Sequence, residues 1–140
     1  MNLTGTFEGY IPTSTDIYLR GNNVGGIKSY YGTAINSEHI IFESGSIYFD
    51  GYASSKYTLS ILKDLTGYNY INVELNGASD TGLFYISITN ILNGGFESRS
   101  QTTGLGNRVA SLDISSISAS RWLNFYTGNQ RIYIYRIWLS

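Results

Sequence analysis

The sequence predicts an all-β protein, a two-sheet antiparallel β-sandwich of the jelly-roll type. Short runs of β-branched and aromatic residues recur along the 140-residue chain, and turn-forming residues separate them. The composition, with 16 glycines, 13 tyrosines and one proline, is typical of short strands joined by tight turns. Because runs of strong helix formers are almost absent, we expect about eight to ten strands rather than alternating β and α units.

The C-terminal stretch, residues 131–139, contains only aromatic, β-branched, leucine and arginine side chains in the sequence RIYIYRIWL. A strand this apolar is protected when both of its edges are paired, so we expect it to be central in a sheet. Its apolar alternation changes parity midway, which predicts either a bulge near Tyr135 and Arg136 or burial of both faces. Residues 122–126 precede it at hairpin spacing and are expected to pair with it.

The N-terminal half begins with residues 1–16, which contain the only proline and are interpreted as a lead-in or linker segment of a single domain spanning residues 1–140. Tyr30 and Tyr31 are adjacent, so in an extended strand they point to opposite sides and at least one is exposed. The predicted strands of this half are residues 17–20, 27–35, 39–42 and 46–49, of which the last two form a hairpin.

In the C-terminal half, residues 71–75 and 84–88 show the period-two alternation of strands that are buried on one side. Residues 93–107 are the longest run without this signal and are predicted to be a loop. Long loops in compact domains are more often functional than not. The predicted strands of this half are residues 57–62, 64–77, 81–90, 109–114 and 122–126.

Charge and composition exclude several classes of partner. Nine lysines and arginines against ten acidic residues give a net charge of −1 without long runs, so a nucleic-acid partner is not expected. No apolar stretch approaches the roughly 20 residues that cross a bilayer, and the first residues lack the pattern of a signal peptide. We therefore expect no membrane partner. The absence of cysteine excludes disulfides and thiol chemistry.

Residues suited to catalysis are scarce. His39 is the only histidine, so a histidine-rich metal site is excluded, and its place beside a strand favours a structural or surface role. No local pattern marks out the two carboxylates that glycoside hydrolysis needs, and no phosphate-binding glycine loop is present. The sequence predicts that the protein is not an enzyme and needs no cofactor. A structural calcium ion held by loop carbonyls and one or two acids is left open.

Aromatic side chains make up 15% of the chain, more than the core requires when isoleucine and leucine are also inside. Tyrosine offers a flat apolar face for stacking on sugar rings, while amide and arginine side chains bond sugar hydroxyls. The alternative for any one tyrosine is a cross-strand pair that stabilises a sheet. The predicted ligand-binding residues, chosen from loops, are Tyr30, Tyr31, Tyr52, Asn22, Asn23, Arg99 and Gln101.

Three stretches carry a resemblance to a known family: DLTGYNYINVEL (64–75), LDISSIS (112–118) and IYIYRIWL (132–139). They resemble strands of galactose-binding-like jelly rolls, in particular the carbohydrate-binding modules of tail and baseplate proteins from phages of Gram-positive bacteria. The resemblance covers about the last 80 residues. It implies a β-sandwich that binds a saccharide through loops at one end, has no catalytic residues and in some members holds a structural calcium.

Two functional hypotheses follow. The first is a non-catalytic carbohydrate-binding module through which a phage tail adheres to host cell-wall polysaccharide or oligosaccharide, with multivalent display supplying avidity. The alternative is a structural domain of a tail or fibre, which forms a homo-oligomer or contacts other tail and baseplate proteins. Either hypothesis places the protein in the virion or outside the cell.

Overall fold

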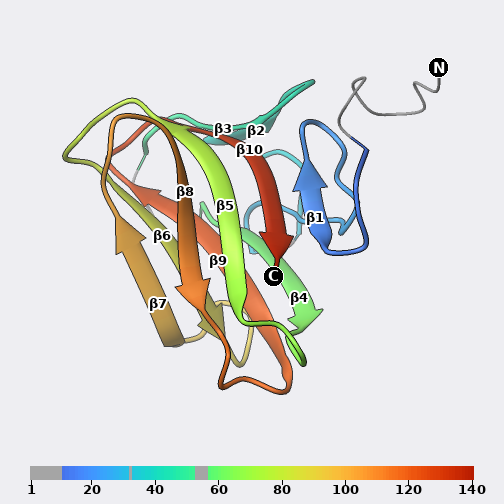
Figure 1. The fold of residues 1–140 in the computed structure, drawn as a ribbon. Coiled ribbons are helices and arrows are strands. Elements are labelled where there is room, and N and C mark those ends of the chain that lie inside the picture. Colours follow the sequence, from blue (N-terminus) through green and yellow to red (C-terminus); the bar gives the residue numbers. More distant parts are fainter. Residues whose placement is uncertain (1–10, 32, 53–56) are drawn as a thin grey trace.

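The computed structural model describes residues 11–31, 33–52 and 57–140, and it is a two-sheet antiparallel jelly-roll sandwich, as the sequence predicts (Figure 1). Within these residues the structure contains ten strands and no helix. The prediction that residues 1–140 form one domain extends to residues 1–10, which lie outside the described ones, and it stays a prediction.

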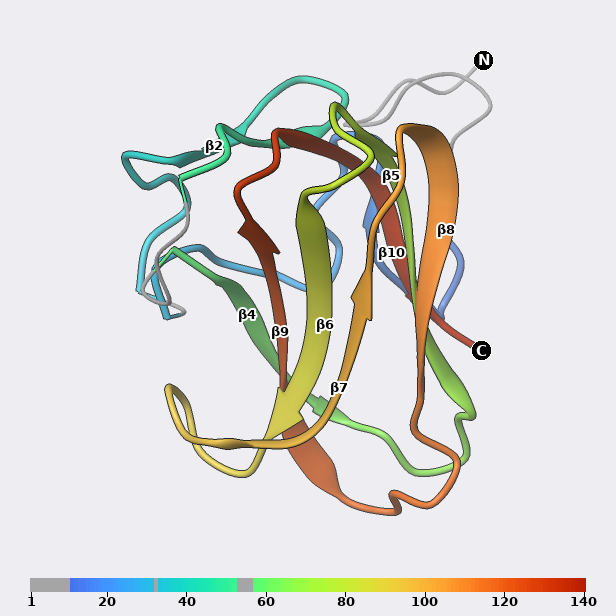
Figure 2. The same cartoon turned by 90° about the vertical axis from the view of Figure 1, so that its left-hand side faces the viewer.

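The two sheets share the strands unequally. The larger sheet contains β1 (Asp16–Leu19), β2 (Ile40–Phe42), β3 (Ile47–Phe49), β5 (Tyr70–Gly77), β8 (Gly106–Asp113) and β10 (Ile132–Leu139). The smaller sheet contains β4 (Leu59–Asp64), β6 (Leu83–Thr89), β7 (Phe96–Thr102) and β9 (Ser120–Gly128). Its strands lie in the order β4-β9-β6-β7, and in Figure 2 they lie to the left of β5, β8 and β10.

The C-terminal strand β10 is central, as predicted. It pairs with β5 along one edge, and β3 and β1 share the other edge. The register with β5 shifts between Ile134 and Arg136, which confirms the predicted bulge at Tyr135. Because the bulge reverses the parity, apolar side chains on both sides of it face the core and are at most 1% exposed: Ile132, Ile134, Ile137 and Leu139.

The predicted hairpin between the last two strands is wrong. β9 pairs with β4 and β6 in the smaller sheet, while β10 crosses to the larger one. Gln130, in the connection, is 1% exposed and donates a hydrogen bond from Nε2 to the carbonyl of Gly82. It occupies space that a side chain at Gly77 would need, because a Cβ there would lie 2.2 Å from Gln130 Oε1. Hairpin spacing alone does not distinguish a turn from such a crossing.

The core lies between the two sheets and follows the predicted alternation. Apolar side chains in β5 and β6 face inward and are fully buried: Ile71, Val73, Leu75, Phe84, Ile86 and Ile88. The β2–β3 hairpin forms as predicted, with Phe42 opposite Ile47. The outer faces of the sheets carry polar side chains together with exposed apolar ones such as Ile41 and Tyr133.

Residues 93–107 are not a single loop, which corrects the sequence prediction. They contain β7 and the start of β8. β7 is an edge strand that pairs only with β6, and none of its side chains is fully buried. A strand in that position has no need for apolar alternation, so its sequence FESRSQT carries no period-two signal.

Candidate functional site

The outer face of the smaller sheet carries polar side chains that are nearly inaccessible to solvent. Thr58, Ser87, Thr89 and Asn124 are between 2% and 6% exposed, and we call them the floor. In the sheet register Ser87 lies opposite Asn124. Asn124 donates from Nδ2 to Thr89 Oγ1 at 3.2 Å, and its Oδ1 accepts from the hydroxyl of Ser60 at 3.2 Å. These bonds fix the amide orientation within the floor.

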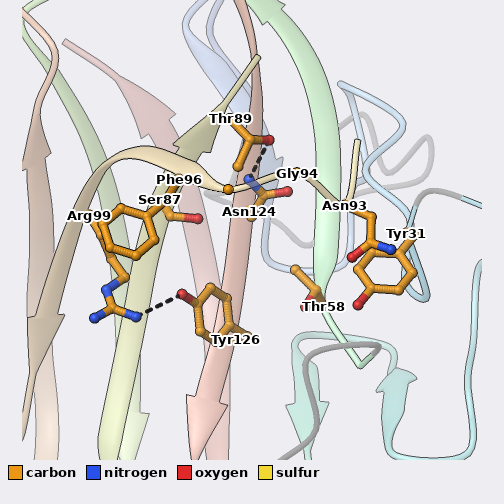
Figure 3. A pocket seen from close by; sticks show the side chains of 11 residues that line it. Tyr31, Thr58, Ser87, Thr89, Asn93, Gly94, Phe96, Arg99, Asn124 and Tyr126 are labelled. Carbon is orange, nitrogen blue, oxygen red and sulfur yellow. Dashed lines mark hydrogen bonds between the residues drawn. The ribbon is translucent and has the colours of Figure 1, made fainter. Parts of the chain in front are cut away.

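A pocket of about 310 Å³ lies above this floor, and we call it the sheet-face pocket. The connection between β6 and β7 contributes Asn93, Gly94 and Gly95 to its lining. Figure 2 shows this connection extending to the left below β4 and β9. In Figure 3, Phe96, Arg99 and Tyr126 stand on one side, with Tyr31 and Asn93 on the other. The described residues that line it are Tyr31, Thr58, Ser87, Thr89, Asn93, Gly94, Gly95, Phe96, Arg99, Asn124 and Tyr126.

One wall of the pocket is a stack of rings and a guanidinium group. Tyr85 on β6 lies opposite Tyr126 on β9, and their rings stack with centroids 4.7 Å apart at 17°. The guanidinium carbon of Arg99 lies 4.9 Å from the Tyr85 ring centroid and 4.4 Å from that of Phe96. Arg99 also donates to the hydroxyl of Tyr126 at 3.5 Å, and this bond raises its pKa above the usual value. Arg99 is therefore cationic and held in one place.

The other wall is supplied by a turn, although the sequence predicted a strand over residues 27–35. The chain reverses between Ser29 and Ala34, where the Ser29 N–H donates to the Ala34 carbonyl at 2.8 Å. Tyr30 and Tyr31 both adopt a left-handed conformation with φ of 56°, so they do not alternate across a strand. Tyr31 lines the pocket. Tyr30 is 39% exposed, which confirms the prediction that at least one of the two rings is exposed.

A cluster of aromatic rings continues from this turn. The Tyr30 ring contacts that of Tyr57 at 5.8 Å, and Tyr57 lies edge-on to His39 at 4.5 Å. Tyr52 stacks on His39 with centroids 4.2 Å apart at 8°. The Nδ1 atom of His39 lies 2.7 Å from Asp50 Oδ2. His39 therefore holds a packed position between two tyrosines, the structural role that its sequence context favoured.

The structure brings some of the predicted binding residues together and separates others. Tyr31 and Arg99 line the sheet-face pocket, and Gln101 lies on the same strand as Arg99, opposite Tyr85. Tyr30 and Tyr52 belong to the adjoining cluster. None of these placements tests binding itself, so the assignments remain predictions.

The two predicted asparagines lie outside the sheet-face pocket. The side chain of Asn23 exchanges two hydrogen bonds of 2.9 Å with the backbone of Ile27, and Asn22 forms a backbone bridge with Leu19. Their contacts therefore close the turn at residues 21–26. The sequence did not predict Asn93, Tyr126 or the floor residues as part of the site. Tyr126 could be found from the pairing of β6 with β9, because it lies directly opposite Tyr85.

Nowhere in residues 11–31, 33–52 and 57–140 do three His, Asp or Glu side chains gather as metal ligands would. A structural calcium ion held by loop carbonyls and one or two acids stays a prediction. No helix long and apolar enough to cross a membrane occurs in the same residues.

Comparisons with known proteins bear on the fold. No protein-family model matches the chain, and no curated protein matches it. Among solved structures, carbohydrate-binding module CBM36 in complex with calcium and xylotriose superposes with a TM-score of 0.54 at 14% identity, over 81% of this chain and 98% of that one. A CBM4 structure superposes with a TM-score of 0.52 at 11% identity, over 99% and 97% of the two chains. The chain therefore shares the jelly-roll sandwich fold of these two structures.

Proposed function

We propose that this chain is a non-catalytic carbohydrate-binding module and that a saccharide binds in the sheet-face pocket. The observation that carries the proposal is the pairing of aromatic walls with a floor of hydroxyl and amide groups. The fold shared with carbohydrate-binding modules supports it.

The chemistry of the pocket suits a sugar ring. A pyranose has apolar C–H faces and a rim of hydroxyl groups, so it needs flat apolar surfaces beside hydrogen-bonding groups. Tyr31, Phe96 and Tyr126 offer the rings. Ser87 and Asn93 offer a hydroxyl and an amide that form no side-chain hydrogen bond with any described residue, so both are available to a ligand.

The lining of the pocket supports a role in binding rather than in catalysis. Hydrolysis of a glycosidic bond ordinarily requires a pair of carboxyl groups on either side of it. None of the described residues that line the pocket is acidic or a histidine. His39 and Asp50 lie in the adjoining aromatic cluster instead.

The biological setting that we propose is adhesion of a phage tail or baseplate protein to the host cell wall. Its support is the resemblance of residues 64–75, 112–118 and 132–139 to modules of such proteins. A single pocket of this size contacts few sugar residues, so several copies on one particle would supply the avidity. Retention of the protein on purified walls of Gram-positive bacteria, and tail genes beside its own gene, are the expected results.

Affinity electrophoresis tests the binding proposal. The protein is run in gels that contain one polysaccharide each, drawn from plant, algal and bacterial cell-wall sources. We expect retardation in at least one gel, and Phe96→Ala should weaken it about tenfold, because the loss of one stacking ring is worth about 1.4 kcal/mol. Phe96 is 54% exposed, so its loss should leave the fold intact.

The matched control is Tyr133→Ala, which removes a 39% exposed ring from the outer face of the larger sheet. It should bind as the wild type does. If no polysaccharide retards the wild-type protein, the proposal is refuted. If both variants lose the same amount of retardation, the binding site does not lie in the sheet-face pocket.

A structural role is the second candidate, and one surface favours it. Ile41, Tyr48 and Tyr133 lie side by side on adjacent strands of the larger sheet, and the rings of Tyr48 and Tyr133 are 4.8 Å apart. Exposed apolar rows of this kind occur at protein interfaces. Size-exclusion chromatography with light scattering should show an oligomer that Tyr133→Glu dissociates if this candidate is right, and a monomer if it is not.

A further inference from the structure

The charge of the sheet-face pocket comes from one side chain. Arg99 is the only charged residue among the described residues that line it, and the other side chains there are neutral. The nearest acid along β7, Glu97, is engaged elsewhere, because Arg121 Nε lies 2.7 Å from Glu97 Oε1. Arg99 forms no ion pair with any residue in the described ranges. The pocket therefore presents an uncompensated positive charge to whatever enters it.

The guanidinium group of Arg99 is also positioned before a ligand arrives. Its guanidinium carbon lies near the rings of both Tyr85 and Phe96, and one N–H reaches the hydroxyl of Tyr126 at a long 3.5 Å. A guanidinium has five N–H donors, so the others keep their capacity for an acceptor. With only one of these donors engaged by Tyr126, the planar group can bind two oxygens side by side, as in arginine–carboxylate pairs. Figure 3 shows Arg99 beside the pocket.

A second donor lies in the same pocket. Ser87 is the direct cross-strand partner of Arg99 on the same face of the sheet, and its hydroxyl bonds to no described residue. It is 2% exposed and lines the same pocket. A hydroxyl and a guanidinium that line one pocket favour an anionic ligand over a neutral one, because both groups donate and hydrogen bonds to charged oxygens are the stronger ones.

We propose that the saccharide bound in the sheet-face pocket is acidic and carries a carboxylate, as a uronic acid does, and that Arg99 binds this group with help from Ser87. The inference rests on the proposed function and narrows it to a substrate class. A carboxylate carries one negative charge, which matches the single arginine among the described residues that line the pocket. A neutral polysaccharide offers the guanidinium group only hydroxyl oxygens, which accept weaker hydrogen bonds than a carboxylate does.

The test compares each acidic polymer with its own neutral form. Polygalacturonate, alginate and a glucuronate polymer are each used before and after chemical reduction of the carboxyl groups, so that only the charge changes. We expect the wild type to bind at least one acidic polymer about tenfold more tightly than its reduced form, with an affinity that falls as salt rises. The variant Arg99→Gln should bind both forms equally weakly, and Arg99→Lys should fall between, because an ammonium lacks the planar fork.

The outcomes separate this inference from the proposed function. Equal binding of the acidic and reduced forms, or binding of neutral polysaccharides alone, would overturn the carboxylate assignment and leave the carbohydrate-binding proposal standing. Binding of a phosphate-containing wall polymer in preference to every polyuronate would overturn it as well. Retention by no polymer would refute both. Because the comparison of the two polymer forms uses the wild-type protein, it does not depend on how the variants fold.

Discussion

Tyr30 and Tyr31 hold consecutive left-handed backbone conformations, each with φ of 56°. A bulky L side chain in this region costs about 1–2 kcal/mol relative to the right-handed conformation. Asn93, across the pocket, also has a positive φ of 60°, but asparagine tolerates it better. The backbone is therefore strained at the residue that places the Tyr31 ring in the pocket wall. Such strain is expected where a side chain serves binding rather than folding.

Replacement of Tyr31 by glycine tests this reading at the residue scale. Glycine adopts the left-handed region without steric cost, so Tyr31→Gly should leave the free energy of unfolding unchanged or raise it by about 1 kcal/mol, while saccharide retention falls. Urea unfolding and affinity electrophoresis measure the two effects. A loss of stability above about 1 kcal/mol would instead make Tyr31 a packing residue.

Asp64 and Asp113 make the stability sensitive to acid. Each carboxylate accepts hydrogen bonds from the backbone N–H and the hydroxyl of a residue two positions on, Thr66 and Ser115, and these bonds lower both pKa values. Because the folded pKa is depressed, the stabilisation is complete above the unfolded pKa of about 3.9 and is lost as pH falls through the folded value. The double variant Asp64→Ala, Asp113→Ala should flatten the fall of the unfolding free energy between pH 4 and pH 2, and an unchanged slope would assign that fall to other groups.

At the scale of elements, β1 is attached to β10 through a buried carboxylate. The side chain of Asp16 is 1% exposed, accepts a bond from the Thr13 N–H at 2.9 Å and lies 2.7 Å from Nε of Arg136. Arg136 in turn packs over the ring of Trp138, 4.4 Å from its centroid. This group of side chains fixes the short strand β1 to the half of β10 that follows the bulge.

Removal of this carboxylate should loosen β1. Asp16→Ala should cost about 2 kcal/mol of unfolding free energy, less than the 3–5 kcal/mol of a fully buried pair, because the Arg136 side chain stays 32% exposed to water. Hydrogen exchange should then quicken in residues 16–19 before it quickens in β5. A fully protected β1 in this variant would show that strand pairing alone holds it.

The sequence patterns predicted elements according to how their two faces are used. β5 and β6 have one apolar face, so alternation revealed them, and the change of parity in residues 132–139 indicated either a bulge in β10, which the structure shows, or burial of both its faces. β7 lacks a fully buried side chain, so no pattern marked it. The turn at residues 29–34 carries tyrosines and a strand-like composition, and only the hydrogen bonds between Ser29 and Ala34 show that the chain reverses there.

At the scale of the whole molecule, the sheet-face pocket is a product of topology. Its walls come from the turn before β2, from the β6–β7 connection and from β7 and β9, which the order β4-β9-β6-β7 brings together. Tyr31 and Arg99 were predicted one at a time from their chemistry. The sequence could not predict that these two side chains line the same pocket. Their proximity depends on the position of β9 between β4 and β6.

The fold itself depends on its last strand. Removal of residues 137–140 deletes two core side chains, Ile137 and Leu139, which are at most 1% exposed, and unpairs the end of β5. The lost burial alone is worth about 3–6 kcal/mol, which is comparable with the total stability of a small domain. We expect this truncation to abolish folding as judged by circular dichroism. A folded, soluble truncation would contradict the central place of β10.

Saccharide binding in the sheet-face pocket is tested most directly by an NMR titration. The ligand is an oligosaccharide prepared from a polysaccharide that retains the protein. We expect the backbone amide signals of four pocket residues to shift together and to saturate at one affinity: Ser87, Asn93, Phe96 and Asn124. The amide signals of Tyr48 and Tyr133, on the outer face of the larger sheet, should stay unchanged. Shifts confined to the outer face of the larger sheet, or the absence of any saturating shift, would contradict binding in the sheet-face pocket.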